Sequence, residues 1–453
     1  MRKIKILLGI VLCVLVFSNS TVWGKTDKSR TEIKESETVL PKKDLERLTT
    51  IITAVKKYYY KLIDYDTLFK RAISGMLTGL DPHSEYLTLD DLKDLEMVTL
   101  GKFGGVGVEV YPDQGAIKVV SPLDDTPAYK AGIKAGDYIV QINNKLVRDM
   151  TLRDAVNMMR GPKGSNLSLT IVRKNEIKPI VFNLRREIIK IKTVKDRILE
   201  PGYGYIRLTW FQEPTEKDMT RAIKRLQRSS KAGLKGLILD IRNNPGGLVE
   251  SAVQIADDFL DSQKLKKNDL IVYTKGQDDE AQIVAKATPG EILANVPIVI
   301  LINDGSASAA EIVAGALQDH KRAIVVGTRS FGKGSVQTLI PIDRVSAIKL
   351  TTALYYTPLG RSIQAKGIEP DINVENIQLS RKDQDEQEIP RVDEAALVDH
   401  IQNGDDVDSN ISSISDRQEK QSKAELDLAY KDYQLYEALH ILKSQNVMRN
   451  KDG

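Results

Sequence analysis

The chain has 453 residues, enough for two or three domains, and its 41% hydrophobic and 28% charged residues are typical of a globular protein. The formal charge is +4, and it falls to +1 when three basic residues near the N-terminus are left out. A net charge this close to zero gives no indication that the protein binds nucleic acid. The only cysteine, Cys13, lies in a segment that we expect to be removed, and the four histidines are scattered. The mature chain is therefore predicted to have no disulfide, no cysteine nucleophile, no metal site and no other cofactor.

Residues 1–24 have the pattern of a signal peptide. The basic residues Arg2, Lys3 and Lys5 precede an apolar run, Ile6–Phe17, and small or polar residues follow as far as Gly24. The apolar run is too short to span a bilayer comfortably, so cleavage after Gly24 is predicted. We expect export to the periplasm or to the outer face of the cytoplasmic membrane. If the segment stays uncleaved, the chain would be associated with the membrane.

Residues 25–100 are predicted to form a polar linker followed by a helical N-terminal region. His83 lies in a segment, Leu80–Leu87, that contains Pro82, and a turn role for His83 is favoured over a role as catalytic base. The apolar residues that recur at helical spacing are expected to be buried. They are Leu48, Ile51, Ile52, Val55, Leu62, Leu68, Ile73 and Leu77.

Residues 101–186 change to short strands separated by glycine turns. A Pro-Ala-x-x-Ala-Gly-Ile-x-x-Gly-Asp-x-Ile element spans 127–139, and a helix, Leu152–Met159, and a strand, Leu167–Val172, follow it. This order resembles a PDZ domain, which implies a β-rich α+β fold. PDZ domains add an extended peptide to a sheet edge and bind its terminal carboxylate with backbone N–H groups. The loop implied for this role comprises Gly104, Gly105, Val106, Gly107 and Val108.

Arg160 follows the predicted helix of this domain. Two interpretations are open for it: a contact with a peptide or with the rest of the protein, or a solvated surface charge. The solvated charge is the default for an arginine on a helix end.

Residues 190–375 alternate between strands and helices. Leu237–Arg242, Val296–Ile302 and Ala323–Val326 are largely apolar runs, and amphipathic helices are predicted over 216–227 and 249–260. Continuous apolar strands between helices indicate an α/β domain around a buried sheet.

Two turns in this domain carry chemistry. The strand Val296–Ile302 runs into a turn with Ser306 and Ser308, and a helix is predicted from Ala309. A serine at a helix N-terminus lies beside free backbone N–H groups that can stabilise an oxyanion. The second turn holds Lys333 between two glycines. A buried lysine loses its proton more easily and can then activate a serine.

These turns, Ser-Ala-Ser-Ala-Ala-Glu at 306–311 and Phe-Gly-Lys-Gly at 331–334, resemble those of the carboxyl-terminal processing proteases, also called tail-specific proteases. The resemblance implies a nucleophile at Ser308, a base at Lys333 and a glutamine that orients the base at Gln337. The family usually has a serine where this chain has Ala310, and Ser306 remains the alternative nucleophile. The segment 80–87 resembles another motif of the family. The implied architecture is a crotonase- or Clp-protease-like α/β core.

The oxyanion donors are predicted to be the N–H of Ala309 and that of Gly246 or Gly247, which lie where a strand gives way to a helix. A Ser308–His320 pair is disfavoured, since a helix would separate the two residues by about 18 Å. An apolar lining that keeps Lys333 neutral is expected from Ile300, Ile302, Val313 and Val336.

Residues 376–453 are predicted to be a charged, partly flexible tail that ends in a helix, 424–442. That helix could pack on the body or on a partner. A homo-oligomer through the N-terminal and C-terminal helices is the predicted assembly.

We therefore expect an exported serine endopeptidase that binds protein or peptide substrates by their C-termini. Two rival functions have other chemistries. One is a PDZ adaptor with an inactive protease-like body, and the other is an acyl-CoA-processing enzyme of the crotonase fold. A lysine base paired with a serine argues against both.

Overall fold

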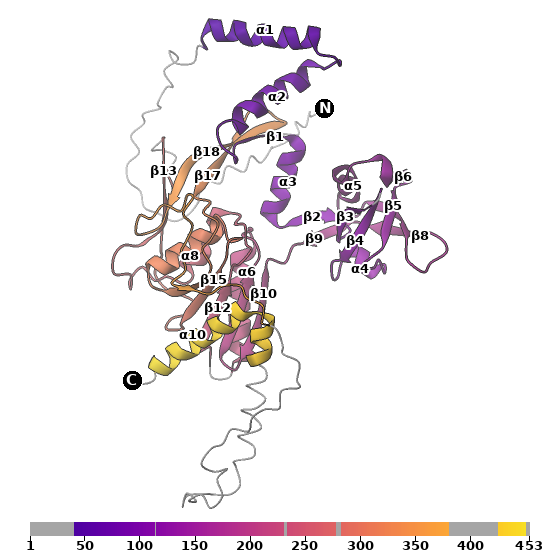
Figure 1. The fold of residues 1–453 in the computed structure, drawn as a ribbon. Coiled ribbons are helices and arrows are strands. Elements are labelled where there is room, and N and C mark those ends of the chain that lie inside the picture. The colour runs from indigo at the N-terminus through magenta and orange to yellow at the C-terminus, as the bar shows by residue number, and fades with distance from the viewer. Residues whose placement is uncertain (1–39, 114, 231–232, 278–281, 380–424, 450–453) are drawn as a thin grey trace, which may run out of the picture. The chain divides into compact units, whose positions relative to one another are not determined.

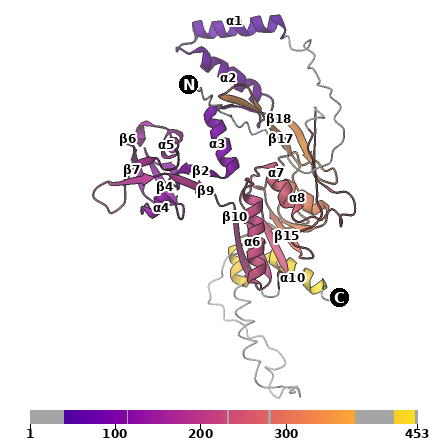
Figure 2. The same cartoon turned by 180° about the vertical axis from the view of Figure 1, so that it is seen from behind.

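A computed structural model describes residues 40–113, 115–230, 233–277, 282–379 and 425–449 (Figures 1 and 2). The chain divides into two units, residues 1–71 and 72–453. The predicted signal peptide and most of the predicted tail lie outside the described residues. Within the described ranges, no helix combines the length and the apolar character needed to cross a membrane.

The first unit contains α1 (Lys42–Tyr58) and the start of α2 (Tyr65–Thr78). The prediction of buried apolar positions is wrong here: α1 has no buried residue, and Leu48 and Ile51 are exposed. Of the eight predicted positions, only Leu77 in α2 is buried. Helical spacing indicates an apolar stripe, but a stripe is buried only where another element covers it.

The second unit continues from α2 into a strand, β1 (Glu85–Thr88), and a helix, α3 (Leu89–Leu100). Thr88 and Asp91 form a capping box at the start of α3. The predicted helical region did not include β1, because this strand forms by pairing with β18, more than 250 residues later in the chain. Local periodicity carries no signal for such a distant partner.

A six-stranded sheet forms the body of the second unit, and the predicted buried sheet of an α/β domain is confirmed. All its neighbours are parallel except β10 and β11, which pair antiparallel at one edge. In sheet order the strands are β10 (Val194–Glu200), β11 (Tyr203–Leu208), β12 (Gly236–Asp240), β15 (Ile298–Ile302), β16 (Ala323–Gly327) and β19 (Ile372–Asn373).

Helices cover both faces of this sheet. Residues 298, 300 and 302 of β15 lie in a core with α6 (Thr215–Ser229), α7 (Val249–Asp257) and α8 (Ala309–Asp319). Residues 299 and 301 lie in a second core with α10 (Tyr433–Arg449) (Figure 1). Successive strand residues point to opposite faces, which is why β15 is apolar at every position. The C-terminal helix therefore packs on the sheet of its own chain.

A second, antiparallel sheet lies in the same unit. Its central strand, β18 (Ser346–Tyr356), pairs with β1, with β13 (Leu270–Gly276) and with β17 (Ser335–Pro341), and β14 (Val284–Lys286) pairs with β13. The register between β17 and β18 shifts at Val336 and Gln337. A bulge of this kind redirects the side chains that follow it.

The segment that resembles a PDZ domain has its own sheet and core. It is inserted through two short strands, β2 (Lys102–Gly105) and β9 (Glu187–Lys190), which pair with each other. The sheet order is β3-β4-β5-β7-β8, with β6 (Lys145–Leu146) beside β5. Its elements are β3 (Val108–Asp113), β4 (Ala116–Pro122), α4 (Pro127–Lys130), β5 (Tyr138–Ile142), α5 (Leu152–Met159), β7 (Asn166–Val172) and β8 (Ile180–Arg185).

Candidate active site

Ser308 lies on a strained turn between a central strand and a helix. β15 ends at Ile302, and α8 begins at Ala309, so Ser308 is the last residue before the helix. Its backbone has φ 55° and ψ −115°, a conformation that residues other than glycine rarely adopt. Strain of this kind persists only where the surroundings hold it, and it is concentrated at functional sites.

Ser306, the alternative nucleophile, is fully buried and has its hydroxyl engaged. Its Oγ donates to the carbonyl of Ile241 at 2.8 Å and accepts the N–H of Asn303 at 3.0 Å. These bonds join the turn after β15 to the end of β12. Ser306 therefore connects two segments of the structure, and it does not line the cleft.

Glu311 joins the serine turn to the lysine turn. Its carboxylate accepts the N–H of Ser308 at 2.8 Å, that of Lys333 at 2.9 Å and that of Gly332 at 2.7 Å. The hydroxyl of Ser330 donates to the same carboxylate at 2.5 Å. Burial raises the pKa of Glu311, while these four hydrogen bonds favour its charged form. One buried side chain thus fixes both predicted reactive residues.

The side chain of Lys333 is partly buried and bonded to Gln337. Its Nζ donates to Oε1 of Gln337 at 2.5 Å and to the carbonyl of Ser335 at 3.3 Å, whereas no hydrogen bond joins it to Ser308. Burial lowers the pKa of Lys333, the charge of Lys349 lowers it further, and the carboxylates of Glu311 and Asp81 oppose the shift. A lysine in this setting can be neutral at a lower pH than a surface lysine.

The turn after β12 supplies one free backbone donor near Ser308. Asn244 Oδ1 accepts the N–H of Gly246 at 2.9 Å, so that donor is engaged. No hydrogen bond within the described residues uses the N–H of Gly247 or that of Ala309. A Cβ on Gly246 would lie 2.9 Å from the Cβ of Ser308 and 3.0 Å from the nitrogen of Ala309, which places the turn against the serine. Of the two predicted alternatives, the structure favours Gly247.

Ser308, Lys333 and Gln337 line one cleft of about 610 Å³. The expected apolar lining is only partly correct. Val336 lines the cleft, but Ile300, Ile302 and Val313 belong to the core beneath it. The other apolar lining residues come from α3, from the turns around β11 and α7, and from β17 and β18. They are Leu95, Val98, Trp210, Phe211, Pro245, Leu248, Val249, Leu339 and Tyr355, and Ile283, just before β14, lines the cleft as well.

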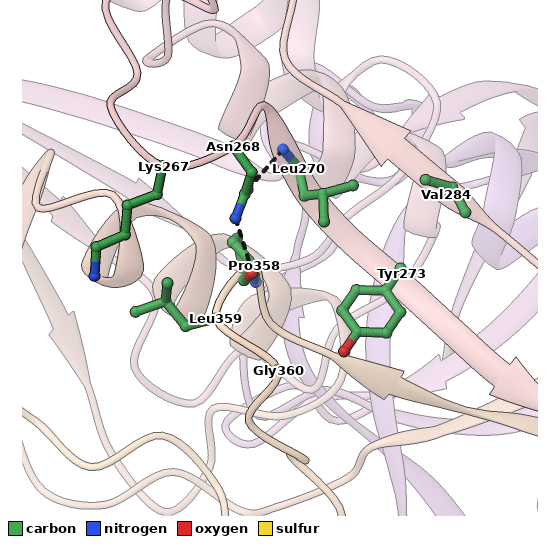
Figure 3. Close-up of a pocket in the computed structure, with 8 residues that line it drawn as sticks. All are labelled: Lys267, Asn268, Leu270, Tyr273, Val284, Pro358, Leu359 and Gly360. Atoms are coloured by element: carbon green, nitrogen blue, oxygen red, sulfur yellow. Dashed lines mark hydrogen bonds between the residues drawn. The ribbon is translucent and has the colours of Figure 1, made fainter.

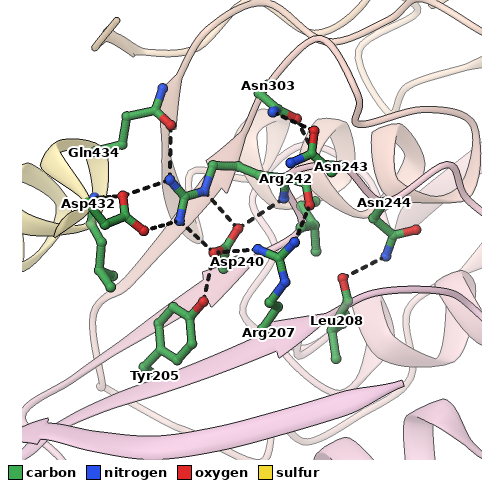
Figure 4. Close-up of polar contacts among 12 residues, drawn as sticks. Tyr205, Arg207, Leu208, Asp240, Arg242, Asn243, Asn244, Asn303, Asp432 and Gln434 are labelled. Carbon is green, nitrogen blue, oxygen red and sulfur yellow. Dashed lines mark hydrogen bonds and ion pairs between the residues drawn. The ribbon is translucent and has the colours of Figure 1, made fainter. Parts of the chain in front are cut away.

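A reciprocal pair of asparagines ties the turn after β12 to the turn after β15 (Figure 4). The N–H of Asn243 donates to Oδ1 of Asn303 at 2.7 Å, and the amide of Asn303 donates to Oδ1 of Asn243 at 2.9 Å. Asn243 has φ 53°, so the turn holds it in the left-handed region. Both turns that border Ser308 are thereby fixed relative to each other.

Arg242 extends this network to the C-terminal helix (Figure 4). Its guanidinium bonds the buried carboxylate of Asp240 and, on the other side, Asp432 at 2.7 Å and Gln434 at 3.0 Å. Burial alone would raise the pKa of Asp240, but hydrogen bonds and charge from Arg242 and Arg207 hold it below its usual value. Asp432 and Gln434 lie at the start of α10, so a segment 190 residues away contacts the turn beside Ser308.

Neither His320 nor His83 lines the cleft with Ser308. His320 follows α8 at the end opposite Ser308, and its Nε2 lies 2.7 Å from the carbonyl of Leu270. His83 is not among the residues that line the cleft, and its N–H donates to Asp81 in a tight turn. Among the described residues, no group of three or more His, Cys, Asp or Glu side chains is arranged to hold a metal ion.

A second hollow, of about 630 Å³, shares no lining residue with the cleft (Figure 3). Asn268 fixes its wall by donating to the carbonyl of Pro358 at 3.2 Å and accepting the N–H of Leu270. The remaining lining residues are Lys267, Tyr273, Val284, Leu359 and Gly360.

The loop Gly104–Val108 leads into the edge strand of the inserted domain. β3 is the first strand of its sheet, with β4 on one side and no neighbouring strand among the described residues on the other. Gly104 is packed against a backbone, since a Cβ there would lie 2.1 Å from the carbonyl of Gly161. Gly107 has φ 76° and lies against Thr126. An edge strand after a glycine loop is suited to peptide addition.

Arg160 contacts the body of the protein. Its guanidinium bonds Asp94 of α3 at 2.5 Å, and the neighbouring Arg153 bonds Asp91 of the same helix at 2.7 Å. Residues 95, 98 and 99 of α3 line the cleft. The inserted domain therefore touches a helix that forms one wall of the cleft.

Sequence reasoning assigned no role to Glu311, Asn303 or Arg242. One signal was present for Glu311, because Ser308 and Glu311 have the spacing of a helix capping box. The partners of Asn303 and Arg242 lie 60 and 190 residues away. No local pattern predicts contacts at that separation.

Comparison with known proteins agrees with this geometry. The model of peptidase family S41 matches residues 202–374, and a PDZ domain model matches residues 118–173. A carboxy-terminal-processing protease of Bartonella bacilliformis is 48% identical over 74% of this chain and 75% of its own length. The carboxy-terminal processing protease CtpA of Bacillus subtilis is 36% identical over 83% of this chain and 78% of its own.

A solved photosystem II D1 C-terminal processing protease is 31% identical, covers 72% of this chain and 86% of its own, and has a TM-score of 0.43. The sequence relatives alone cover most of the chain, including both turns and the inserted domain. The chain belongs to the carboxy-terminal processing proteases, which are serine peptidases of family S41, and it carries a PDZ domain.

Proposed function

We propose that this protease is an exported endopeptidase that cleaves peptide bonds with Ser308 as nucleophile and Lys333 as general base, on substrates whose C-termini bind the PDZ domain. One observation carries the proposal: Ser308 and the partly buried Lys333 line a single cleft beside the free N–H groups of Ala309 and Gly247. The chemistry requires only protein groups and water.

The surroundings of Lys333 support its role as a base. A neutral amine has two N–H groups and one lone pair, and the carbonyl oxygens of Gln337 and Ser335 accept two hydrogen bonds from Nζ. The third position on Nζ would then carry the lone pair that accepts a proton. Gln337 contributes no charge, whereas a carboxylate at the same place would hold the ammonium protonated.

The proposed reaction has two steps. The lysine amine takes the proton of the Ser308 hydroxyl as Oγ attacks the carbonyl carbon, and the N–H groups of Ala309 and Gly247 stabilise the oxyanion. The ammonium then returns the proton to the leaving amine, and an acyl-enzyme remains. A water molecule, deprotonated by the same lysine, releases the acyl group and the serine hydroxyl.

Single substitutions test the dyad. Ser308→Ala and Lys333→Arg should both lose peptidase activity on a fluorogenic peptide, because arginine stays protonated and cannot act as a base. Lys267→Arg, in the separate hollow, is the matched control and should keep wild-type activity. Activity retained by Ser308→Ala but lost in Ser306→Ala would instead assign the nucleophile to Ser306.

The PDZ domain is proposed to bind the free carboxylate of a substrate through the loop Gly104–Val108. The exposed edge of β3 supports this role. The salt bridges from Arg153 and Arg160 to α3 support a further role in gating, because α3 lines the cleft. An amidated substrate should bind more weakly and be cleaved more slowly than its free acid. Equal rates for the two substrates would contradict carboxylate capture.

Export and assembly are also proposals. The basic and apolar pattern of residues 1–24 supports export to the periplasm or to the outer face of the cytoplasmic membrane. The absence of any buried residue in α1 supports oligomerisation through the N-terminal helices. The apolar face of α10 is already buried on its own sheet, so the C-terminal helix is a weaker candidate for an interface. Sedimentation of wild type and of a chain lacking residues 1–58 would test this.

A further inference from the structure

We propose that Asp81 is a positioning residue for Lys333 and acts on it through the hydroxyl of Thr351 and the amide of Gln337. The inference rests on the proposed role of Lys333 as base. It assigns a function to a segment, Leu80–Leu87, that the sequence analysis singled out and that the dyad does not use.

A continuous chain of hydrogen bonds joins the two residues. Thr351 Oγ1 donates to Asp81 Oδ1 at 3.1 Å, and Gln337 Nε2 donates to Thr351 Oγ1 at 3.2 Å. Oε1 of the same amide accepts from Lys333 Nζ at 2.5 Å. Three elements meet here: the turn before β1, the middle of β18 and the bulge of β17.

The direction of every bond in this chain is set at Asp81. A carboxylate can only accept hydrogen bonds, so the Thr351 hydroxyl must donate its single proton to Asp81. The same hydroxyl oxygen must therefore accept from Gln337, which turns the NH₂ group of the amide toward Thr351. The carbonyl oxygen of the amide is then left to face Lys333, where it can accept a proton from the amine.

Without the carboxylate, both orientations of the amide are available. The Thr351 hydroxyl could then donate to Gln337 Oε1, and the flipped amide would present N–H groups to Lys333. Two opposed donors repel each other, and the amine would lose the acceptor that fixes its orientation. Ser335 does not prevent this flip, because its hydroxyl, which accepts from Gln337 Nε2 at 2.9 Å, can also rotate to donate.

Asp81 is itself held firmly. Its carboxylate accepts the N–H groups of His83 and Ser84 at 2.8 and 3.0 Å and the hydroxyl of Ser84 at 2.6 Å. The buried Ser84 hydroxyl also accepts the N–H of Thr351 at 3.1 Å. The turn is therefore anchored to β18 by two routes, and pairing of β1 with β18 continues this contact.

Asp81 also acts on Lys333 through its charge. Among the described residues, four charged or titratable groups act on the lysine: Glu311 of α8, Lys349 of β18, and Asp81 and His83 of the turn before β1. The negative charge of Asp81 favours the ammonium form, so its removal should lower the pKa of Lys333. The rate of a lysine-base protease should then rise at a lower pH than in wild type.

Two substitutions separate the geometric effect from the charge. Asp81→Asn keeps acceptor and donor atoms in the turn but removes the charge, and Thr351→Val removes the linking hydroxyl but keeps the charge. We expect Thr351→Val to lower kcat/KM about tenfold or more, and Asp81→Asn, whose amide oxygen can still accept from Thr351, to lower it less. Only Asp81→Asn should also move the midpoint of the pH–rate profile clearly to lower pH, and Thr351→Ser should restore activity.

The matched control is Thr352→Val, the next position on β18, whose hydroxyl bonds Thr338 and belongs to no part of this chain of bonds. It should keep wild-type kcat/KM, and thermal unfolding should verify that all variants are folded. Wild-type rate and midpoint in both Asp81→Asn and Thr351→Val would overturn the inference. An equal loss in Thr352→Val would overturn it as well, by assigning the effect to the strand in general.

The outcome can be distinguished from failure of the proposed dyad. If Lys333→Ala stays active, lysine is not the base and both proposals fall. If Lys333→Ala is inactive while the Asp81 and Thr351 variants match wild type, only the positioning role falls. Should Asp81→Asn not fold, the pair Thr351→Val and Thr351→Ser still decides the question.

Discussion

Replacing Glu311 by glutamine would place a neutral amide where four donors now converge on one carboxylate. The carboxylate accepts from Ser308 and Lys333 through one oxygen and from Ser330 and Gly332 through the other. A glutamine has one oxygen and one NH₂ group, so at least one backbone N–H would face another donor. The Ser330 hydroxyl can rotate to accept, which leaves Gly332 as the donor without an acceptor in the best orientation.

The magnitude follows from this geometry. A buried donor without an acceptor costs about 1–3 kcal/mol, and each hydrogen bond that loses its ionised partner weakens by a further ~1 kcal/mol. With two such weakened bonds, from Ser308 and Lys333, the total is about 3–5 kcal/mol, which corresponds to a reduction in kcat/KM of roughly 150- to 5,000-fold if all of it is lost from the transition state. We expect most of this free energy to be lost from the transition state, because these hydrogen bonds join the segments that hold Ser308 and Lys333.

The assay combines kcat/KM as a function of pH with thermal unfolding. Loss of the negative charge should lower the pKa of Lys333, so the rise in rate should move to lower pH while its plateau falls. Glu369→Gln, which removes an exposed carboxylate, is the charge-matched control. A Glu311→Gln enzyme with wild-type plateau and midpoint would refute the reasoning. A fall in unfolding temperature with unchanged kcat/KM would show that the carboxylate serves only stability.

Three further predictions address other parts of the molecule. Gly247→Ala should be inactive, because a Cβ at its φ of 135° would lie 2.1 Å from the carbonyl of Phe211; an active variant would exclude this turn from the oxyanion site. Asp432→Ala should lower kcat/KM because Arg242 loses its ion pair with Asp432, and Asp432→Glu should partly restore the activity. Equal activity of the wild type and both variants would show that α10 does not support the turn after β12. Burial and nearby acidic side chains raise the pKa of Asp258 from 3.8 to about 7, so its charged form destabilises the fold increasingly as pH rises from 3.8 to 7. Asp258→Asn should therefore gain about 1–2 kcal/mol of stability at pH 8, after discounting for partial exposure, and nothing near pH 4; denaturant unfolding at both pH values measures this.

Much of this protease was determined by its local sequence. Apolar runs such as 298–302 indicated buried strands, and the residues after them indicated a turn that places a serine at the start of a helix. Both signals are local, because strand burial and helix starts depend on neighbouring residues. The spacing of Lys333 and Gln337 likewise placed two side chains within hydrogen-bonding distance, since only four positions separate them.

Other features were decided by contacts between distant segments. Leu48 and Ile51 have the spacing of a buried helix face, yet burial requires a partner that the spacing cannot supply. Strand β1 exists because β18 pairs with it, and folding buries Ser306 against the carbonyl of Ile241 while it leaves Ser308 on the wall of the cleft.

The supports of the predicted dyad belong entirely to this second group. Glu311, Thr351 and Asp81 are ordinary polar residues in the sequence, and each gains its role from donors or acceptors that folding brings to it. Hydrogen bonds act over about 3 Å, so their partners are fixed only once the two sheets and the turns between them are in place. The sequence by itself determined which side chains could react, and the tertiary structure decided which residues hold them.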